Sequence, residues 1–239
     1  AKPEDEATGA AWDAPFGRGR PGWHLECSAM AMKYLGETLD IHCGGVDLIF
    51  PHHEDEIAQS EAATGKPFSR FWCHGEFLQI DGTKMSKRLG NITTVKDLRE
   101  RGVSAAAIRH FVYSTHYRKQ MNLSGVGLEG SMEAVRRVGE FAHRLAEAKG
   151  GTEALAEAAV AAETEFRAAI QEDLNAPEAV AALFTFLQKA NAQLDKRGKD
   201  PASLDAARRA FAVMDGVLDI QPRAIRITVG ESTVEPLVE

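Results

Sequence analysis

Cys27, His52 and Glu56 offer a sulfur, a nitrogen and an oxygen donor in the first part of a chain of 239 residues. His52 and Glu56 are four positions apart, so on a helix their side chains share one face. A cysteine from a neighbouring helix would complete a donor set that suits tetrahedral Zn²⁺. His53 competes with His52 for this role, and histidine–glutamate pairs are also common on helix surfaces. The residue types predict a metal site, and the spacing alone leaves both histidines open.

A strand, a glycine turn and a helix must position this histidine and carboxylate. The apolar run that ends at residues 40–42 is typical of a buried strand, and Gly44 and Gly45 follow it. Glycine permits the close approach of a ligand to the backbone. Pro51 then stands where a helix can begin, because the first turn of a helix needs no N–H from it. An α/β sheet places a ligand site at a strand–turn–helix junction of this kind.

Cys27 belongs to a second predicted helix, which runs from Pro21 to about Leu35 and is stopped by Gly36. Trp23 lies four residues before Cys27 and therefore shares its face of the helix. The alternative for Cys27 is burial as a small apolar residue, which is the usual fate of a free cysteine.

A basic loop follows a stretch rich in β-forming residues at 71–80 and an Asp-Gly turn at 81–82. Lys84, Lys87 and Arg88 place three cations within five residues, on a loop and not on a periodic helix face. Such a run is often only a solvated charge cluster. The glycines on either side and the embedded methionine favour a mobile loop that closes on an anion, for which lysine acts as a point charge.

The rest of the chain is predicted to be helical. Two short helices at residues 94–100 and 105–112 precede an antiparallel bundle of four helices that begins near residue 130. The tail after residue 220 has room for a strand but not for a domain. The predicted bundle core consists of apolar residues at helical spacing: Met132, Val135, Val138, Phe141, Leu155, Val160, Phe166, Ile170, Val180, Leu183, Phe184, Leu187, Leu204, Phe211, Met214 and Val217.

Composition sets limits on the class of protein. The chain is 44% hydrophobic and 26% charged, as expected for a soluble globular protein. It contains no apolar run long enough for a transmembrane helix, and its polar start excludes a signal peptide on the chain as given. The three cysteines are an odd, widely spaced set, which predicts free thiols in the cytoplasm. Cys43 and Cys73 remain possible metal ligands. A net charge of −7 excludes a small basic nucleic-acid module but not an enzyme with a local basic face.

Five motifs in order resemble cysteinyl-tRNA synthetase, a class I aminoacyl-tRNA synthetase. The resemblance covers roughly residues 10–220, and Arg88 replaces the final serine of the Lys-Met-Ser-Lys-Ser signature of the class. It implies an α/β plus all-α fold: the C-terminal half of a Rossmann catalytic domain followed by a helical-bundle tRNA-binding domain. The motifs lie at residues 19–30, 44–56, 84–88, 116–118 and 173–179.

The resemblance also implies roles for single residues. Cys27, His52 and Glu56 match three of the four zinc ligands of the family, in which the metal holds the thiolate of substrate cysteine. Trp23 and His42 match positions that line the amino-acid pocket.

Nucleotide chemistry is implied in the same way. Gly45 and Asp47 match the motif that holds adenosine, and Lys84 and Lys87 match the lysines that stabilise the phosphates of ATP, bound with Mg²⁺, during adenylate formation. The implied partners are tRNA-Cys, L-cysteine and ATP, with no membrane. The implied division is 1–93 for the catalytic half, 94–125 for a stem-contact connector, 126–220 for the bundle and 221–239 for a tail.

The chain departs from the family pattern in one respect. The family carries a His-x-Gly-His sequence and a first zinc-ligating cysteine in an N-terminal Rossmann half, and neither precedes the motifs here. We therefore expect the chain to be a C-terminal portion, inactive alone, that works with the missing N-terminal half from the same gene product or from a companion chain.

Two alternatives remain open. A related ligase of the mycothiol pathway activates cysteine in the same way but joins it to an amino sugar, and comparing tRNA with glucosaminyl-inositol as acceptor separates the two. A non-catalytic, RNA-binding paralogue would retain the fold and tRNA binding but lose the metal.

Overall fold

The computed structural model describes residues 1–85, 90–222, 227–229 and 232–234, and it divides the chain into two compact units. Unit 1 comprises residues 1–77 with 117–119, and unit 2 comprises residues 78–116 with 120–239. The four-part division expected from the sequence stays a prediction.

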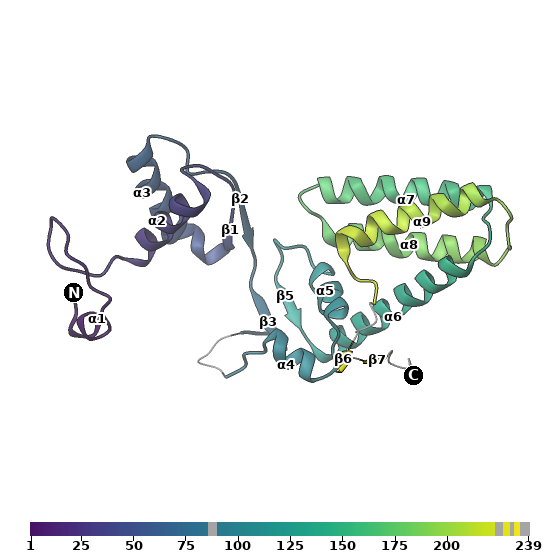
Figure 1. The fold of residues 1–239 in the computed structure, drawn as a ribbon, viewed down its shortest axis with the longest axis horizontal. Coiled ribbons are helices and arrows are strands. Elements are labelled where there is room, and N and C mark those ends of the chain that lie inside the picture. The colour runs from purple at the N-terminus through teal and green to yellow at the C-terminus, as the bar shows by residue number, and fades with distance from the viewer. Residues whose placement is uncertain (86–89, 223–226, 230–231, 235–239) are drawn as a thin grey trace. The chain divides into compact units, whose positions relative to one another are not determined.

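Unit 1 is built on two parallel strands, β1 (Leu39–Gly45) and β2 (Ser69–Gly75). Helix α3 (Glu54–Thr64) connects them and packs against α2 (Trp23–Leu35) (Figure 1). Gly36 ends α2 and Gly65 ends α3, both with positive φ, which a glycine adopts at little cost. The predicted helix before the strand is confirmed. The predicted strand is present, but it continues through Gly44 and Gly45, where a turn was expected, and Leu39 is its one buried residue.

The segment between β1 and α3 differs from the prediction of a single helix that starts at Pro51. After β1 the chain makes a short 3₁₀ turn, η1 (Val46–Leu48), and one π-helical turn, η2 (Ile49–His53), before regular helix begins. Phe50 has extended backbone angles inside this turn, so the regular i to i+4 ladder starts only after it. His52 therefore lies in η2, whereas Glu56 lies in the first turn of α3.

The first twenty residues form local structure. Helix α1 (Pro3–Ala7) is followed by a bridge between Trp12 and Gly19, whose backbones exchange two hydrogen bonds of 2.8 and 2.9 Å. Arg18 connects the two parts through contacts with Glu6 and Asp13.

Unit 2 begins with a three-stranded sheet in the order β4–β3–β5. It contains β3 (Leu78–Ile80), β4 (Thr83–Lys84) and β5 (Met121–Leu123). Asp81 and Gly82, with φ of 47° and 76°, join β3 to β4, which confirms the predicted turn. Residues 86–89 of the basic loop, with Lys87 and Arg88, lie outside the described residues.

Six helices follow in the described part of unit 2. The short pair is α4 (Val95–Glu100) and α5 (Ala105–Tyr113), and the bundle comprises α6 (Gly125–Glu147), α7 (Glu153–Gln171), α8 (Ala176–Leu194) and α9 (Pro201–Leu218). The side chains of Ser124, Thr152, Asn175 and Asp200 each accept a backbone N–H at the start of a bundle helix. The predicted antiparallel bundle is confirmed, and α7 packs against both α8 and α9 (Figure 1).

The predicted bundle core is correct in most positions and wrong in three. Met132, Val160 and Val217 are 38%, 66% and 54% exposed. Their neighbours in sequence or on the helix face are buried instead, among them Ser131 and Leu218. A helix has 3.6 residues per turn, so an apolar residue one position off the packing face projects into solvent.

Two short strands, β6 (Ile227–Val229) and β7 (Ser232–Val234), pair antiparallel in the tail, where a strand was predicted. All three cysteines are free thiols, as predicted. Among the described residues, no helix has both the length and the apolarity needed to cross a bilayer.

The bundle is expected to lose stability as the pH falls below about 6.5, because of His110. Burial lowers the pKa of His110, whose ring packs on Phe184 and lies 3.1 Å from Ser131 Oγ. As the pH falls, His110 therefore takes up a proton in the unfolded chain before it does so in the folded chain. The free energy of unfolding then decreases by up to about 1.4 kcal/mol per pH unit until the folded-state pKa is reached. The replacement His110→Gln should flatten this part of the pH profile in urea unfolding followed by far-UV circular dichroism.

The matched control is His143→Gln, since His143 is exposed on α6 beside Glu147. An equal flattening by both variants would contradict the assignment to His110.

Candidate metal and amino-acid site

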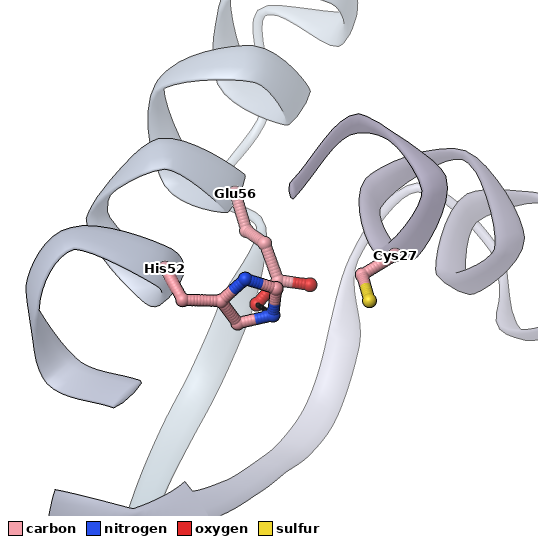
Figure 2. Close-up of side chains that lie close together, drawn as sticks. All are labelled: Cys27, His52 and Glu56. Carbon is pink, nitrogen blue, oxygen red and sulfur yellow. Dashed lines mark ion pairs between the residues drawn. The ribbon is translucent and has the colours of Figure 1, made fainter. Parts of the chain in front are cut away.

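Three elements of unit 1 bring together the side chains of the predicted metal site. Cys27 projects from α2, His52 from η2 and Glu56 from α3, and their ligand atoms lie within 4.8 Å of one another. Figure 2 shows the imidazole of His52 beside the carboxylate of Glu56, with the sulfur of Cys27 facing them from the other helix. The i, i+4 spacing thus produces the convergence expected from it, even though His52 precedes the regular helix.

The donor set fits a zinc ion in chemistry and size. A tetrahedral ion with Zn–N, Zn–O and Zn–S bonds of ordinary length has ligand atoms about 3.3 to 3.8 Å apart. The three side chains need to move only slightly closer together than the 4.8 Å limit within which they lie to bind such an ion. Glu56 is 1% exposed, and its ion-pair partners in the described part of the chain are imidazoles only. Because a buried carboxylate is costly without a compensating cation, this arrangement favours a bound metal.

A second donor set shares the same carboxylate. His42, His53 and Glu56 also have ligand atoms within 4.8 Å of one another. The Oε2 atom of Glu56 lies 3.0 Å from Nε2 of His42, 3.6 Å from His52 and 4.0 Å from His53. The competition between His52 and His53 that the sequence left open thus persists in the structure, and only the first set contains sulfur.

Burial and three neighbouring histidines lower the pKa of His53 to about 4. Its Nδ1 lies 2.8 Å from Nε2 of His74, so one of the two rings donates a hydrogen bond to the other. At neutral pH His53 is therefore an uncharged imidazole in a buried polar chain. It can act as a ligand or as a support for one.

The imidazole of His52 is oriented by its neighbours. Its Nδ1 lies 2.7 Å from Nδ1 of His24, and Nε2 of His24 lies 3.5 Å from Asp55. Trp23 stacks on the His52 ring with centroids 4.3 Å apart and remains 56% exposed. The second ring nitrogen of a metal-binding histidine is commonly held in this way, which leaves Nε2 for the metal.

His42 and Trp23, the predicted pocket residues, both lie at this cluster. His42 hydrogen-bonds Glu56 and meets Trp72 edge to face at 4.8 Å. Sequence reasoning did not single out Trp72, His74 or His24. The alternation of β2 could have indicated the first two, because they are two residues apart and pair with His42 and Gly44 of β1.

Gly44 is required by this packing. A Cβ there would lie 2.5 Å from Cε1 and 2.8 Å from Nε2 of His53. A Cβ added to Gly45 would likewise lie too close to a neighbour, at 2.5 Å from Asp47 Oδ1. The structure thus brings together Gly45 and Asp47, the predicted adenosine-binding pair, with Asp47 exposed.

The three thiols have different surroundings. Burial and then the charge of Glu56 raise the pKa of Cys27, so without a cation its thiol stays protonated. Partial desolvation and then the adjacent Cys73 raise the pKa of Cys43, although Cys43 is exposed, and the two residues are register partners on β1 and β2. Within the described residues, Cys43 and Cys73 belong to neither of the two candidate metal groups.

The side chains of the two lysines of the basic loop lie outside the part of the chain that the structure describes. The backbone of Lys84 forms β4 in unit 2, and Lys87 lies outside the described residues.

Two family models match the chain. A model described as "tRNA synthetases class I (C) catalytic domain" matches residues 2–133, which is more than half of the chain, and one described as "DALR domain" matches residues 165–220. The first covers the metal cluster, and the second covers most of the bundle.

The chain is similar to curated proteins named cysteine–tRNA ligase. It is 47% identical to that of Solibacter usitatus over 212 residues, covering 87% of this chain and 46% of the relative. It is 43% identical to that of Chlamydia abortus over 232 residues, covering 95% and 48%. The chain thus spans about half the length of the curated relatives it matches.

Among solved structures, the chain resembles a leucyl-tRNA synthetase from Agrobacterium radiobacter K84, solved in a ternary complex with tRNA and LeuAMS. The TM-score is 0.67 over 90% of this chain and 34% of that one, at 15% identity. At this identity the similarity concerns the fold alone.

Proposed function

The chain belongs to the class I (C) tRNA synthetases, and from this premise we propose that it forms the cysteine-recognising and tRNA-binding part of a cysteine–tRNA ligase. The whole activity is the ATP-dependent formation of cysteinyl-adenylate and transfer of the cysteinyl group to tRNA-Cys. The observation that carries the proposal is the convergence of Cys27, His52 and Glu56 on one point of unit 1. The similarity to curated cysteine–tRNA ligases supports the choice of amino acid.

Cys27, His52 and Glu56 would hold Zn²⁺, which supplies a position that a thiolate fills far better than a hydroxyl group does. The site would then discriminate against serine, because the serine hydroxyl binds the metal poorly, so no editing step is needed. The exposed indole of Trp23, stacked on His52, offers an apolar wall for the bound amino acid. His42 fixes the carboxylate of Glu56 from the strand side.

Adenylate formation needs the substrate carboxylate to attack the α-phosphorus of ATP while pyrophosphate departs. In the proposal, the exposed carboxylate of Asp47 accepts hydrogen bonds from the ribose hydroxyls, and Gly45 leaves room for the nucleoside. Lys84 and Lys87 stabilise the negative charge on the α-phosphate and on the leaving pyrophosphate, with Mg²⁺ on the phosphates. This is catalysis by position and electrostatics.

The sheet of unit 1 supports the proposal that another segment completes the catalytic fold. Parallel sheets are normally covered on both faces, and two strands alone are marginal. Ile41 and Phe71, which are register partners on β1 and β2, are 63% and 68% exposed on one face. The Rossmann half that precedes the matched region in the relatives is the proposed cover, as a part of the same gene product or as a companion chain.

Cysteine-dependent exchange of pyrophosphate into ATP tests the proposal. The 239-residue chain alone is expected to give no exchange, and adding the N-terminal half of the Solibacter usitatus relative should produce it with cysteine and not with serine. Asp47→Asn should reduce the restored exchange by at least about 10-fold, because a ribose contact is lost.

Robust exchange by the isolated chain would contradict the need for a second half. Exchange that depends equally on serine, or that appears only with another amino acid, would contradict the proposed substrate.

A further inference from the structure

Three exposed cations line a hollow at one end of the helical bundle, and a fourth, Lys196, lies on one of the same loops. The loop between α6 and α7 carries Lys149, and the loop between α8 and α9 carries Lys196, Arg197 and Lys199. The hollow has a volume of about 390 Å³ and is lined by Glu147, Ala148, Lys149, Gly150, Leu194, Arg197, Gly198 and Lys199. We refer to residues 148–152 and 195–200 as the paired loops.

The paired loops are fixed to each other through their backbones. Gly151 N donates to Asp200 O at 2.8 Å, and Asp200 N donates to Gly151 O at 3.1 Å. A Cβ on Gly198 would lie 2.0 Å from Gly151 O, so the contact exists only because residue 198 is glycine. The four cationic side chains therefore start from a framework held in one arrangement.

The acidic residues of this end have partners outside the set of four cations. Glu147, which lines the hollow, lies 3.4 Å from Nε2 of His143. Asp195 pairs with Arg144 at 2.6 Å, and Asp200 accepts the N–H groups that begin α9. In the described part of the chain, the four cations of the paired loops make no ion pair. In a chain of net charge −7, four free cations at one point are a local positive field.

Arg197 has a backbone conformation that is uncommon for a residue with a side chain. Its φ is +50°, the left-handed region in which glycine is usual after the end of a helix. A residue with a side chain costs of order 1 kcal/mol there, and such strain is concentrated at functional positions. The chain thus keeps an arginine where stability alone favours glycine.

We propose that the paired loops bind the phosphate backbone of RNA, at Lys149, Lys196, Arg197 and Lys199. This rests on the proposed function, because it names the part of the bundle that contacts the tRNA. The lining contains no aromatic side chain on which a base could stack, so the contact is to phosphate and not to sequence. An acidic protein is disfavoured as the occupant, because only Ala148 and Leu194 offer apolar anchors.

The test is binding of a tRNA-Cys transcript to the full chain over a series of salt concentrations. The double variant Lys149→Gln/Lys199→Gln is expected to weaken binding by about 10-fold at low salt and to lower the slope of log Kd against log salt by about 1.5 to 2. The matched control is Lys189→Gln/Arg209→Gln, which removes two exposed cations from the bodies of α8 and α9 that have no ion-pair partner among the described residues. It should change the affinity by less than about 2-fold.

The outcomes separate the two proposals. If the parent chain binds tRNA-Cys and both double variants bind it equally well, the paired-loop proposal is wrong and the proposed function stands. If the parent chain does not bind the transcript at any salt concentration, the tRNA-binding role of the bundle fails together with the inference. Binding of an unrelated hairpin RNA with the same dependence on Lys149 and Lys199 supports a contact to phosphate alone.

Discussion

Replacing Cys27 by serine is expected to abolish stable zinc binding by the chain. Cys27 is the sole sulfur in the first donor set, and the remaining His52 and Glu56 offer one nitrogen and one carboxylate. Replacing a residue that only hydrogen-bonds to a zinc ligand typically weakens zinc affinity by about 10- to 100-fold. Replacing a direct sulfur ligand should weaken it by more. The zinc content is measured by elemental analysis after the chain has been purified with zinc and gel-filtered. It should fall from about one ion per chain to near zero.

Cys43→Ser is the matched control, because Cys43 is exposed on β1 and belongs to neither donor set among the described residues. It should leave the zinc content unchanged. Full zinc occupancy in the Cys27→Ser variant would show that the sulfur is not a ligand and would remove the basis of cysteine recognition in the proposal.

His53→Asn separates the two donor sets that share Glu56. If zinc is held by Cys27, His52 and Glu56, this variant should keep its zinc but lose affinity by about 10-fold, as expected for a supporting residue. If instead His42, His53 and Glu56 hold the ion, this variant should lose it and the Cys27→Ser variant should retain it. The two variants together therefore assign the ligands.

The predictions from sequence were best where one local rule decides the structure. The i, i+4 spacing of His52 and Glu56 agrees with their approach to 3.6 Å, although the spacing alone left His53 open as well. The predicted stop at Gly36 follows from its positive φ, which glycine adopts at little cost. The π-helical turn before α3 was missed, because Pro51 is compatible both with the first turn of a helix and with the turn that precedes it.

Side-chain contacts between elements were less accessible. His24 supports His52 only because α2 packs against α3, the helix that follows η2, and no spacing in the sequence connects two residues 28 positions apart. The exposed Met132 and Val160 show the same limit in the bundle, where the rotation of a helix is set by its partners and not by its own apolar pattern. The roles of Lys84 and Lys87 remain expectations from resemblance.

Gly198→Ala is expected to destabilise the bundle by about 2 to 4 kcal/mol. The new Cβ would overlap Gly151 O at 2.0 Å and Gly151 C at 2.3 Å, and both are backbone atoms that no rotamer change can move away. The paired loops must separate, which breaks the two hydrogen bonds between Gly151 and Asp200, each worth about 1 kcal/mol, and disturbs the start of α9. Urea unfolding followed by far-UV circular dichroism measures the change.

Gly216→Ala provides the control, since Gly216 is an exposed residue of α9 whose Cβ would meet nothing within 4 Å. There the same substitution should stabilise by up to about 1 kcal/mol through helix propensity. Opposite signs for the two alanines would establish that the close approach of the paired loops, and not glycine content, determines stability.

Because the same approach fixes the cations of the paired loops, Gly198→Ala should also weaken tRNA binding under conditions where the chain stays folded. A variant that keeps parental stability would mean that the loops are not held in this arrangement.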